Sequence, residues 1–301
     1  MSRTSAEIET QPDCWRRAAR LADEAPTVAA LPADGSCVAV VGCGTSLFMA
    51  QCYAALREGA GRGRTDVFAA SEYPHERAYS FVLALCRSGT TSEVVALLER
   101  LPATTDSLVL TGVATTPATV AARRSLVLDF ADEESVVQTR FATTALALLR
   151  ASLGDDIASA AADAERALAA PLPLDPARTE QVSFLGTGWT YGLANEAALK
   201  LREAARFWAE SYLAMEYRHG PISIAAPGRA VWPFGPLPPG LADQIAATGA
   251  QLVHGGDLDP LAALVLAQRF AVAAAGARGL DPDRPRALTR SVILPATEVT
   301  P

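Results

Sequence analysis

The chain of 301 residues has almost no lysine, because Lys200 is the only lysine among its 26 basic residues and the rest are arginines. Asparagine is equally scarce: Asn195 is the only one, five residues before that lysine. A chain rich in alanine and arginine and poor in lysine and asparagine is typical of a GC-rich genome, in which arginine replaces lysine at ordinary surface positions. A lysine that survives this replacement is therefore a candidate for a specific role.

Other absences exclude whole classes of protein. No stretch of about 18 uninterrupted apolar residues exists, so we expect no membrane-spanning helix and no membrane partner. The net charge of -7 argues against a broad nucleic-acid surface. The three histidines are scattered, which argues against a metal site. The five cysteines form no CxxC pair, so we expect reduced thiols in a cytoplasmic protein.

The bulk composition is that of a globular protein, with half of the residues hydrophobic and 20% charged. The length suggests about two domains of roughly 150 residues each. A proline-rich stretch at 171–176 is the best candidate for a boundary between them. We therefore predict one domain at residues 1–170 and a second at residues 171–301.

The order of apolar runs predicts an α/β fold. Short runs of branched aliphatic residues alternate with amphipathic stretches, which is typical of a parallel sheet with helices on both faces. We expect strands at 37–41, 66–69, 81–86, 107–110, 125–129, 182–185, 230–234 and 251–254. We expect helices at 12–22, 47–58, 92–100, 138–153, 155–169, 193–210 and 261–276.

The two halves begin with similar turns, V-V-G-C-G-T-S at 40–46 and F-L-G-T-G-W-T at 184–190. This similarity predicts a duplication of one α/β unit. The glycines do not fit a dinucleotide site, since Leu47 stands where the third glycine should be. No GxxxxGK[ST] motif for a nucleotide exists either, and we expect no cofactor.

Hydroxyl side chains follow two of the predicted strands. Thr45 and Ser46 come after the first, and the stretch 88–92 with Arg87 beside it comes after the third. These serines and threonines could simply cap the helices that follow. Because both turns lie at one edge of a parallel sheet, where helix N-termini present free N–H groups, we favour a phosphate site.

Charged residues also line up on the helix predicted at 193–210. Glu196, Lys200, Glu203 and Phe207 fall on one stripe of a helix that is otherwise rich in apolar residues. An ordinary surface salt bridge is one interpretation of the Glu–Lys spacing. The apolar surroundings favour a buried helix instead, in which a carboxylate near an ammonium can act as a general base.

Several motifs together resemble the sugar isomerase (SIS) domain, and above all the isomerase half of glucosamine-6-phosphate synthase. In the first half these are E-I-x-x-Q-P at 7–12, G-C-G-T-S at 42–46, C-R-S-G-T-T at 86–91 and Q-T-R at 138–140. In the second half they are N-E-A-A-L-K-L-R-E at 195–203, A-E-S-Y at 209–212, R-H-G-P at 218–221 and D-x-P-R-x-L-x-x-S-V at 283–292. The resemblance implies two tandem flavodoxin-like SIS domains.

The resemblance implies an aldose–ketose isomerase, or isomerase/deaminase, acting on an amino hexose 6-phosphate through an enol-type intermediate. Glu203 would be the base that moves a proton between C1 and C2. His219 would help to open the sugar ring, donated across the interface of a homodimer. Glu196 and Lys200 would line the site and set its protonation. By itself, His219 could also be a hydrogen-bonded core histidine.

The resemblance also assigns binding residues for the phosphorylated sugar substrate. The phosphate would be bound by Thr45, Ser46, Cys86, Arg87, Ser88 and Thr91. The sugar would lie near Gly44, Val136, Val137 and Arg290.

Two positions depart from the synthase. It has serine where Cys86 stands, and lysine, implicated in ring opening, where Arg290 stands. Arginine neither shuttles protons at neutral pH nor forms a Schiff base. The synthase's nucleophilic cysteine has no counterpart, since Cys14 lies inside a predicted helix, and we expect no glutaminase activity. A fructosamine-phosphate deglycase and a non-catalytic sugar-phosphate-binding regulator remain alternative functions.

Overall fold

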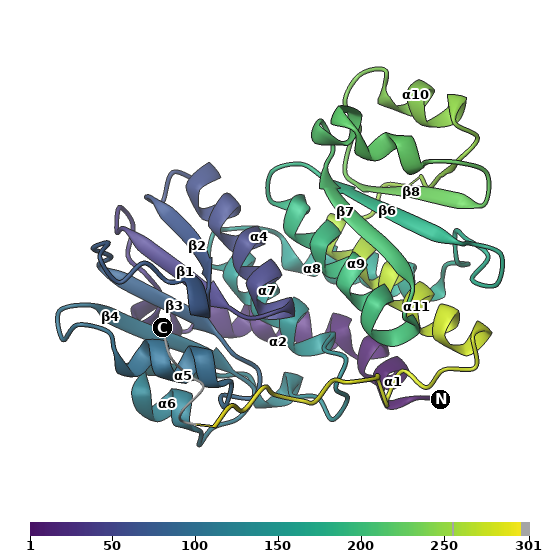
Figure 1. Ribbon diagram of the computed structural model, residues 1–301. Helices are drawn as coiled ribbons and strands as arrows, with labels where there is room; N and C mark the ends of the chain where they lie inside the picture. The colour runs from purple at the N-terminus through teal and green to yellow at the C-terminus, as the bar shows by residue number, and fades with distance from the viewer. Residues whose placement is uncertain (255, 296–301) are drawn as a thin grey trace. The chain divides into compact units, whose positions relative to one another are not determined.

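The computed structural model describes residues 1–254 and 256–295 (Figure 1). The chain forms two compact units, which are described separately. The five-stranded unit contains Asp13–Glu134, Arg140–Ala158 and the segment that begins at Thr289. The four-stranded unit contains Met1–Pro12, Ser135–Thr139 and Ser159–Leu288. The predicted domain division after residue 170 stays a prediction.

The five-stranded unit is built on a parallel sheet with the strand order β2-β1-β3-β4-β5. Its strands are β1 (Val38–Gly42), β2 (Thr65–Ala69), β3 (Phe81–Leu85), β4 (Asp106–Thr111) and β5 (Arg124–Val127). Its helices are α2 (Gln11–Ala22), α3 (Ala25–Ala30), α4 (Thr45–Gly59), α5 (Ser92–Glu99), α6 (Pro117–Ala121) and α7 (Arg140–Ala151). Two short 3-10 helices are η1 (Ala70–Glu72) and η2 (Asp129–Ala131).

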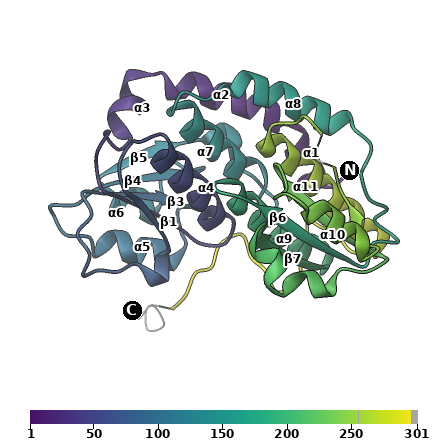
Figure 2. The same cartoon turned by 90° about the horizontal axis from the view of Figure 1, so that it is seen from above.

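Both faces of this sheet are covered by helices, with α4 and α7 on one side and α5 and α6 on the other (Figure 2). Every residue of β1 and β3 is buried. A strand that is covered on both faces has a continuous apolar sequence rather than an alternating one. The sequences V-A-V-V and F-V-L-A-L therefore form central strands. The predicted α/β class, with parallel sheets and helices on both faces, is confirmed.

The four-stranded unit has a second parallel sheet with the order β7-β6-β8-β9. Its strands are β6 (Gln181–Gly186), β7 (Trp208–Leu213), β8 (Arg229–Phe234) and β9 (Gln251–Leu252). Its helices are α1 (Arg3–Glu9), α8 (Ile157–Ala169), α9 (Thr190–Ala205), α10 (Leu241–Ala247), α11 (Pro260–Ala277), and the 3-10 helices η3 (Glu216–His219) and η4 (Pro221–Ile224). Its strands lie in the order second, first, third, fourth when they are counted along the chain. The strands β2, β1, β3 and β4 of the other sheet have the same order.

Helix α11 is the one helix of the described residues that is long and apolar enough to cross a membrane by length and composition alone. Most of it is buried within the four-stranded unit, where it contacts α9. Leu264 and Phe270, for example, have no exposed surface. Its apolar composition is therefore explained by its position in the core of this unit.

The predicted helix at 193–210 is wrong at its C-terminal end. Helix α9 stops at Ala205, because Arg206 adopts a left-handed conformation (φ 48°) and its N–H bonds back to the carbonyls of Leu201 and Arg202. This conformation ends the helix without the glycine that usually marks such a position. The residues that follow form strand β7, which the sequence analysis missed. The short helices α1, α3, α6 and α10 were also missed.

Candidate functional site

The strand order of the five-stranded unit reverses between β1 and β3. Strand β1 pairs with β2 on one side and with β3 on the other, and Val41 lies opposite Ala84. The turns that follow β1 and β3 therefore leave the sheet side by side. In open α/β sheets, ligands bind at this point, outside the carboxyl ends of the strands.

The turn after β1 requires glycine at two positions. A Cβ on Gly42 would lie 2.7 Å from the carbonyl carbon of Ser46, which is too close for any other residue. Gly44 has a positive φ of 54° and precedes α4, which begins at Thr45 with no side-chain cap. Thr45 and Ser46 are both buried in this first turn. The capping position is thus Gly44, and neither hydroxyl belongs to the capping residue.

The turn after β6 in the four-stranded unit has the same geometry. A Cβ on Gly186 would lie 2.4 Å from the carbonyl oxygen of Thr190, and Gly188 has a φ of 56°. The two similar sequence segments thus adopt the same strand–turn–helix arrangement. The duplication of one α/β unit stays a prediction.

The turn after β3, residues 87–92, is called the hydroxyl loop. Its Ser88 Oγ accepts a hydrogen bond from the N–H of Thr90 at 3.2 Å. Thr91 precedes α5 but its side chain makes no capping hydrogen bond. Ser88 is buried, whereas Thr90 and Thr91 are half-buried. The alternative that these hydroxyls only cap the helix is therefore wrong for Thr91.

Arg87, predicted to bind the phosphate, lies inside the unit. Its side chain is 5% exposed, and its Nη1 is 3.7 Å from a carboxylate oxygen of the fully buried Glu133. Its Nη2 donates to the carbonyl of Arg290 at 2.9 Å. The guanidinium thus already has protein partners, and its buried position favours a role in holding the hydroxyl loop in place.

The two residues that depart from the synthase also belong to the five-stranded unit. Cys86 is buried at the end of β3, and its N–H bonds to the carbonyl of Leu110. Arg290 forms an ion pair with Asp132 at 2.5 Å, with about a third of each side chain exposed. The Arg290 guanidinium is therefore engaged by a carboxylate, and its predicted contact with the sugar stays a prediction.

The predicted carboxylate–lysine cluster lies in the four-stranded unit, on α9. Figure 1 labels this helix. The Lys200 side chain is 1% exposed, and its Nζ is 2.5 Å from Oε2 of Glu203 and 3.4 Å from Oε1 of Glu196. Glu196 is as buried as the lysine, whereas 18% of the Glu203 side chain is exposed. A surface salt bridge, the alternative interpretation, is therefore wrong for Glu196 and Lys200.

This cluster has two carboxylates for one ammonium, so it carries a net charge of about -1 when all three groups are ionised. Nearby on the same helix, burial lowers the pKa of Arg202, against the attraction of Glu203 and Glu196, which raises it.

Phe207, predicted to lie on the same stripe, lies beyond the end of α9 and is buried against Phe270. The stripe therefore consists of the three charged residues only.

His219 ends the 3-10 helix η3 and is exposed. The alternative that it is a core histidine is therefore wrong. Its neighbour Arg218 donates to Gln244 Oε1 at 2.7 Å and to the carbonyl of Pro239 at 2.5 Å, which fixes the backbone beside it. An exposed imidazole is available to a substrate or to a second chain.

Val136 and Val137 lie in the four-stranded unit, in the short segment Ser135–Thr139. Ser135 anchors this segment, since its N–H and hydroxyl both donate to the carboxylate of Glu7 on α1. The Ser135 hydroxyl also lies 2.9 Å from the carbonyl of Val137. Val137 is buried, so only its backbone is suited to a polar contact with a sugar.

Residues that the sequence analysis missed surround the hydroxyl loop. Ser291 contacts three of its hydroxyls, and Asp132 and Glu133 pair with the two arginines. Ser291 stands inside the C-terminal motif at 283–292, so its position there was the available signal. Asp132 and Glu133 belong to no motif that we recognised.

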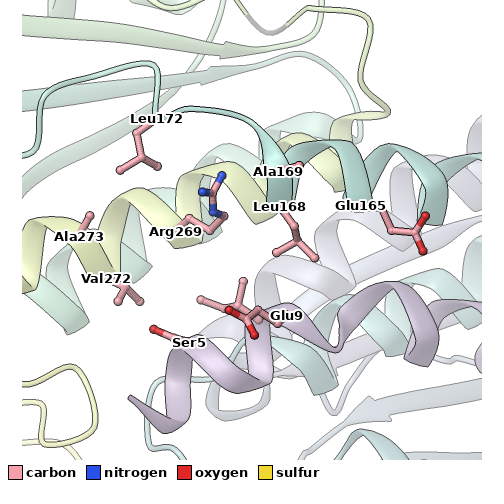
Figure 3. Close-up of a pocket in the computed structure, with 10 residues that line it drawn as sticks. Ser5, Glu9, Glu165, Leu168, Ala169, Leu172, Arg269, Val272 and Ala273 are labelled. Carbon is pink, nitrogen blue, oxygen red and sulfur yellow. The ribbon is translucent and has the colours of Figure 1, made fainter. Parts of the chain in front are cut away.

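A separate pocket of about 610 Å³ lies among α1, α8 and α11 (Figure 3). Its lining is mostly apolar, with Glu9, Glu165 and Arg269 as its charged residues. Arg269 donates to the carbonyls of Ala167 and Ala170, both at 2.7 Å. Burial lowers the Arg269 pKa, against the attraction of Glu9. None of the predicted site residues lines this pocket.

No family model matches the chain. Over 146 residues it is 34% identical to the glutamine–fructose-6-phosphate aminotransferase (isomerizing) of Leifsonia xyli. This enzyme is also called glucosamine-6-phosphate synthase. That match covers 38% of the chain and 24% of the relative. The chain therefore spans about a quarter of the length of this relative, and the resemblance to the synthase is confirmed for that part alone.

Solved structures match almost the whole chain. Glucosamine-6-phosphate deaminase from Thermotoga maritima gives a TM-score of 0.82 at 22% identity, covering 97% of this chain and 100% of that one. Tagatose-6-phosphate ketose/aldose isomerase from Escherichia coli gives a TM-score of 0.78 at 19% identity, with 98% and 97% covered. At these identities the matches show the fold alone. The chain has the fold of phosphosugar isomerases and deaminases.

Proposed function

We propose that this protein is a phosphosugar isomerase/deaminase of the SIS type that moves a proton between C1 and C2 of an amino hexose 6-phosphate. The observation that carries the proposal is the cluster on α9, in which a buried ammonium holds a partly exposed carboxylate. Burying charges costs desolvation free energy, so the presence of this cluster on α9 favours a functional role for it. Proton abstraction next to a carbonyl is a use that fits a carboxylate base.

In this mechanism, Glu203 removes the proton from C2 of the open-chain sugar, and the electrons move to the C1 carbonyl to give an enol-type intermediate. The same carboxylic acid then returns the proton to C1, while the proton on the C2 hydroxyl or amino group passes to the C1 oxygen. In a 2-amino sugar this shift creates an imine at C2, and water hydrolyses the imine to a ketose and ammonia. Lys200, 2.5 Å from Glu203, donates a hydrogen bond that orients the carboxylate, and Glu196 holds Lys200 in position.

The phosphate is proposed to bind at the carboxyl ends of β1 and β3. Ser46 in the first turn of α4, and Ser88 and Thr91 of the hydroxyl loop before α5, supply hydroxyl donors. Both helices begin at this edge, and helix N-termini attract anions through their free N–H groups and their dipoles. Such a site needs neither lysine nor a metal.

The proposal extends to the domain organisation, the location in the cell and the oligomeric state. We infer two tandem SIS domains, supported by the matched glycine turns and by the shared strand order of the two sheets. We also propose a cytoplasmic homodimer in which His219 of one subunit serves the other subunit's site. The exposure of His219 is compatible with that role.

The proposal is tested by following hydrogen exchange at C1 and C2 by NMR in D₂O with the purified full chain. The substrates are glucosamine 6-phosphate, fructose 6-phosphate and fructosamine 6-phosphate. We expect exchange with at least one of the first two. Splitting of fructosamine 6-phosphate alone would indicate a deglycase, and binding of all three without exchange or splitting would indicate a regulator.

A further inference from the structure

The C-terminal segment lies along the hydroxyl loop of the five-stranded unit. The carbonyl of Val292 accepts a hydrogen bond from the N–H of Ser92, the first residue of α5, at 3.1 Å. Ser92 Oγ in turn accepts from the N–H of Leu294 at 2.9 Å. Residues 290–292, called the strap, therefore run beside the start of α5, where the proposed function places the phosphate.

Within the strap, Ser291 places its hydroxyl among those of the loop. Its Oγ is 3.1 Å from Ser88 Oγ, 2.9 Å from Thr90 Oγ1 and 3.4 Å from Thr91 Oγ1. Four hydroxyl groups thus gather at the N-terminus of one helix. One anionic group that bonds to Ser88 and Thr91 would also be within reach of Ser291, because these oxygens already lie within hydrogen-bond distance of it.

We propose that Ser291 is a phosphate-binding residue of this protein, supplied by the strap to a site otherwise built from the loops after β1 and β3. This inference rests on the proposed function, which assigns the phosphate to the hydroxyl loop. A hydroxyl is suited to the position because it can donate to a phosphate oxygen and still accept a bond from a neighbouring hydroxyl.

Two arginines hold the strap rather than contact the phosphate. Arg87 donates to the carbonyl of Arg290 at 2.9 Å, and Glu133 fixes Arg87 from inside the unit. The Arg290 guanidinium pairs with Asp132 at 2.5 Å. With its backbone and its side chain both bound, Arg290 is a positioning residue that sets the place of Ser291 next to it.

The test is the affinity of the full chain for inorganic phosphate, measured by calorimetry at fixed ionic strength. A lost hydrogen bond to a charged group weakens binding by about tenfold or more, so we expect that loss in Ser291→Ala and in Ser88→Ala. Ser291→Thr keeps the hydroxyl and should bind within about threefold of the wild type. The control is Ser71→Ala, which removes an exposed hydroxyl of the same unit and should change nothing.

The outcomes test the role of Ser291 and the proposed phosphate site separately. Weaker binding in Ser88→Ala with unchanged binding in Ser291→Ala would overturn the role of Ser291 and leave the phosphate site intact. Tighter binding in Ser291→Ala would also overturn it, and would mean that the strap competes with the phosphate. Unchanged binding in both variants would remove the proposed phosphate site itself. Circular dichroism melting curves verify that each variant is folded.

Discussion

At the scale of single residues, the cluster on α9 explains why one lysine remains in a chain of arginines. Lys200 is a compact point charge that fits between two carboxylates of its own helix with 1% of its side chain exposed. Arginine is planar and broad, and it would have to place a five-donor fork in the same buried space. Arginine in place of Lys200 is therefore unfavourable at this position.

Removing the Lys200 ammonium should destabilise the protein strongly. In Lys200→Met the buried carboxylate of Glu196 loses the ammonium beside it, and breaking a buried pair on one side costs about 3–5 kcal/mol of unfolding free energy. Adding Glu196→Gln removes one of the two carboxylate charges and should recover part of that loss. The measurement is urea unfolding of the single and double variants.

The matched control is an exposed pair. Arg178 is 89% exposed beside Asp175, so Arg178→Ala should cost less than about 1 kcal/mol. A loss in Lys200→Met as small as this control would show that the charges on α9 do not depend on one another.

At the scale of the elements, the first helix is fixed by a residue from the far end of the chain. The Asp283 carboxylate accepts hydrogen bonds from the N–H groups of Arg3 and Thr4 at 2.7 and 2.9 Å, and from the Thr4 hydroxyl at 2.7 Å. Free N–H groups at a helix start need such partners. Asp283 therefore ties α1 to the residues that follow α11.

This contact should make the stability of α1 depend on pH. Burial raises the Asp283 pKa, but the hydrogen bonds from Thr4 and Arg3 outweigh it and hold the pKa below its ordinary value. The stabilisation is thus complete above the unfolded pKa of about 3.9 and is lost as the pH falls through the lower folded pKa. In Asp283→Asn we expect a loss of about 1 kcal/mol at pH 7, the usual size of a capping contact.

The check is urea unfolding of Asp283→Asn and wild type between pH 7 and pH 2.5. The difference between them should shrink steadily below about pH 4. Asp243→Asn changes an exposed aspartate on α10 and should follow the wild type at every pH. A difference that is constant with pH would mean that the carboxylate charge of Asp283 contributes nothing.

The elements show how far local patterns predict structure. Buried strands such as β1 and β3 were predicted nearly to the residue, because their apolar runs are continuous. Strand β7 was missed because its sequence W-A-E-S-Y-L follows a helical pattern directly, and a left-handed arginine rather than a glycine separates them. The α9 cluster could be predicted from spacing within one helix. The contacts of Ser291 could not, because they join residues about 200 positions apart.

At the scale of the whole molecule, the proposed dimer makes a prediction that mixing can test. If His219 acts in the partner's site, a heterodimer of His219→Ala and Glu203→Gln chains has one site with both changes and one with neither. After random exchange of equal amounts, half of the dimers are of this kind, and about a quarter of wild-type activity should return.

Neither variant should be active alone, so the recovered activity has a clear baseline. The subunits are mixed after mild denaturation and refolding, and the isomerase activity of the mixture is compared with that of each parent. Activity no higher than the parents, in a mixture shown to be dimeric by light scattering, would place Glu203 and His219 in the same subunit's site or remove His219 from the site.

The central claim is that the Glu203 carboxylate moves the proton between C1 and C2. The most direct measurement is the rate of deuterium entry at C1 and C2 in D₂O for Glu203→Gln, with Glu180→Gln as an exposed control from the same unit. Loss of a general base slows proton transfer by about 10²–10⁴-fold, so exchange should fall at least about 100-fold while the affinity for inorganic phosphate stays unchanged. Exchange in Glu203→Gln close to that of the Glu180→Gln control would contradict the account.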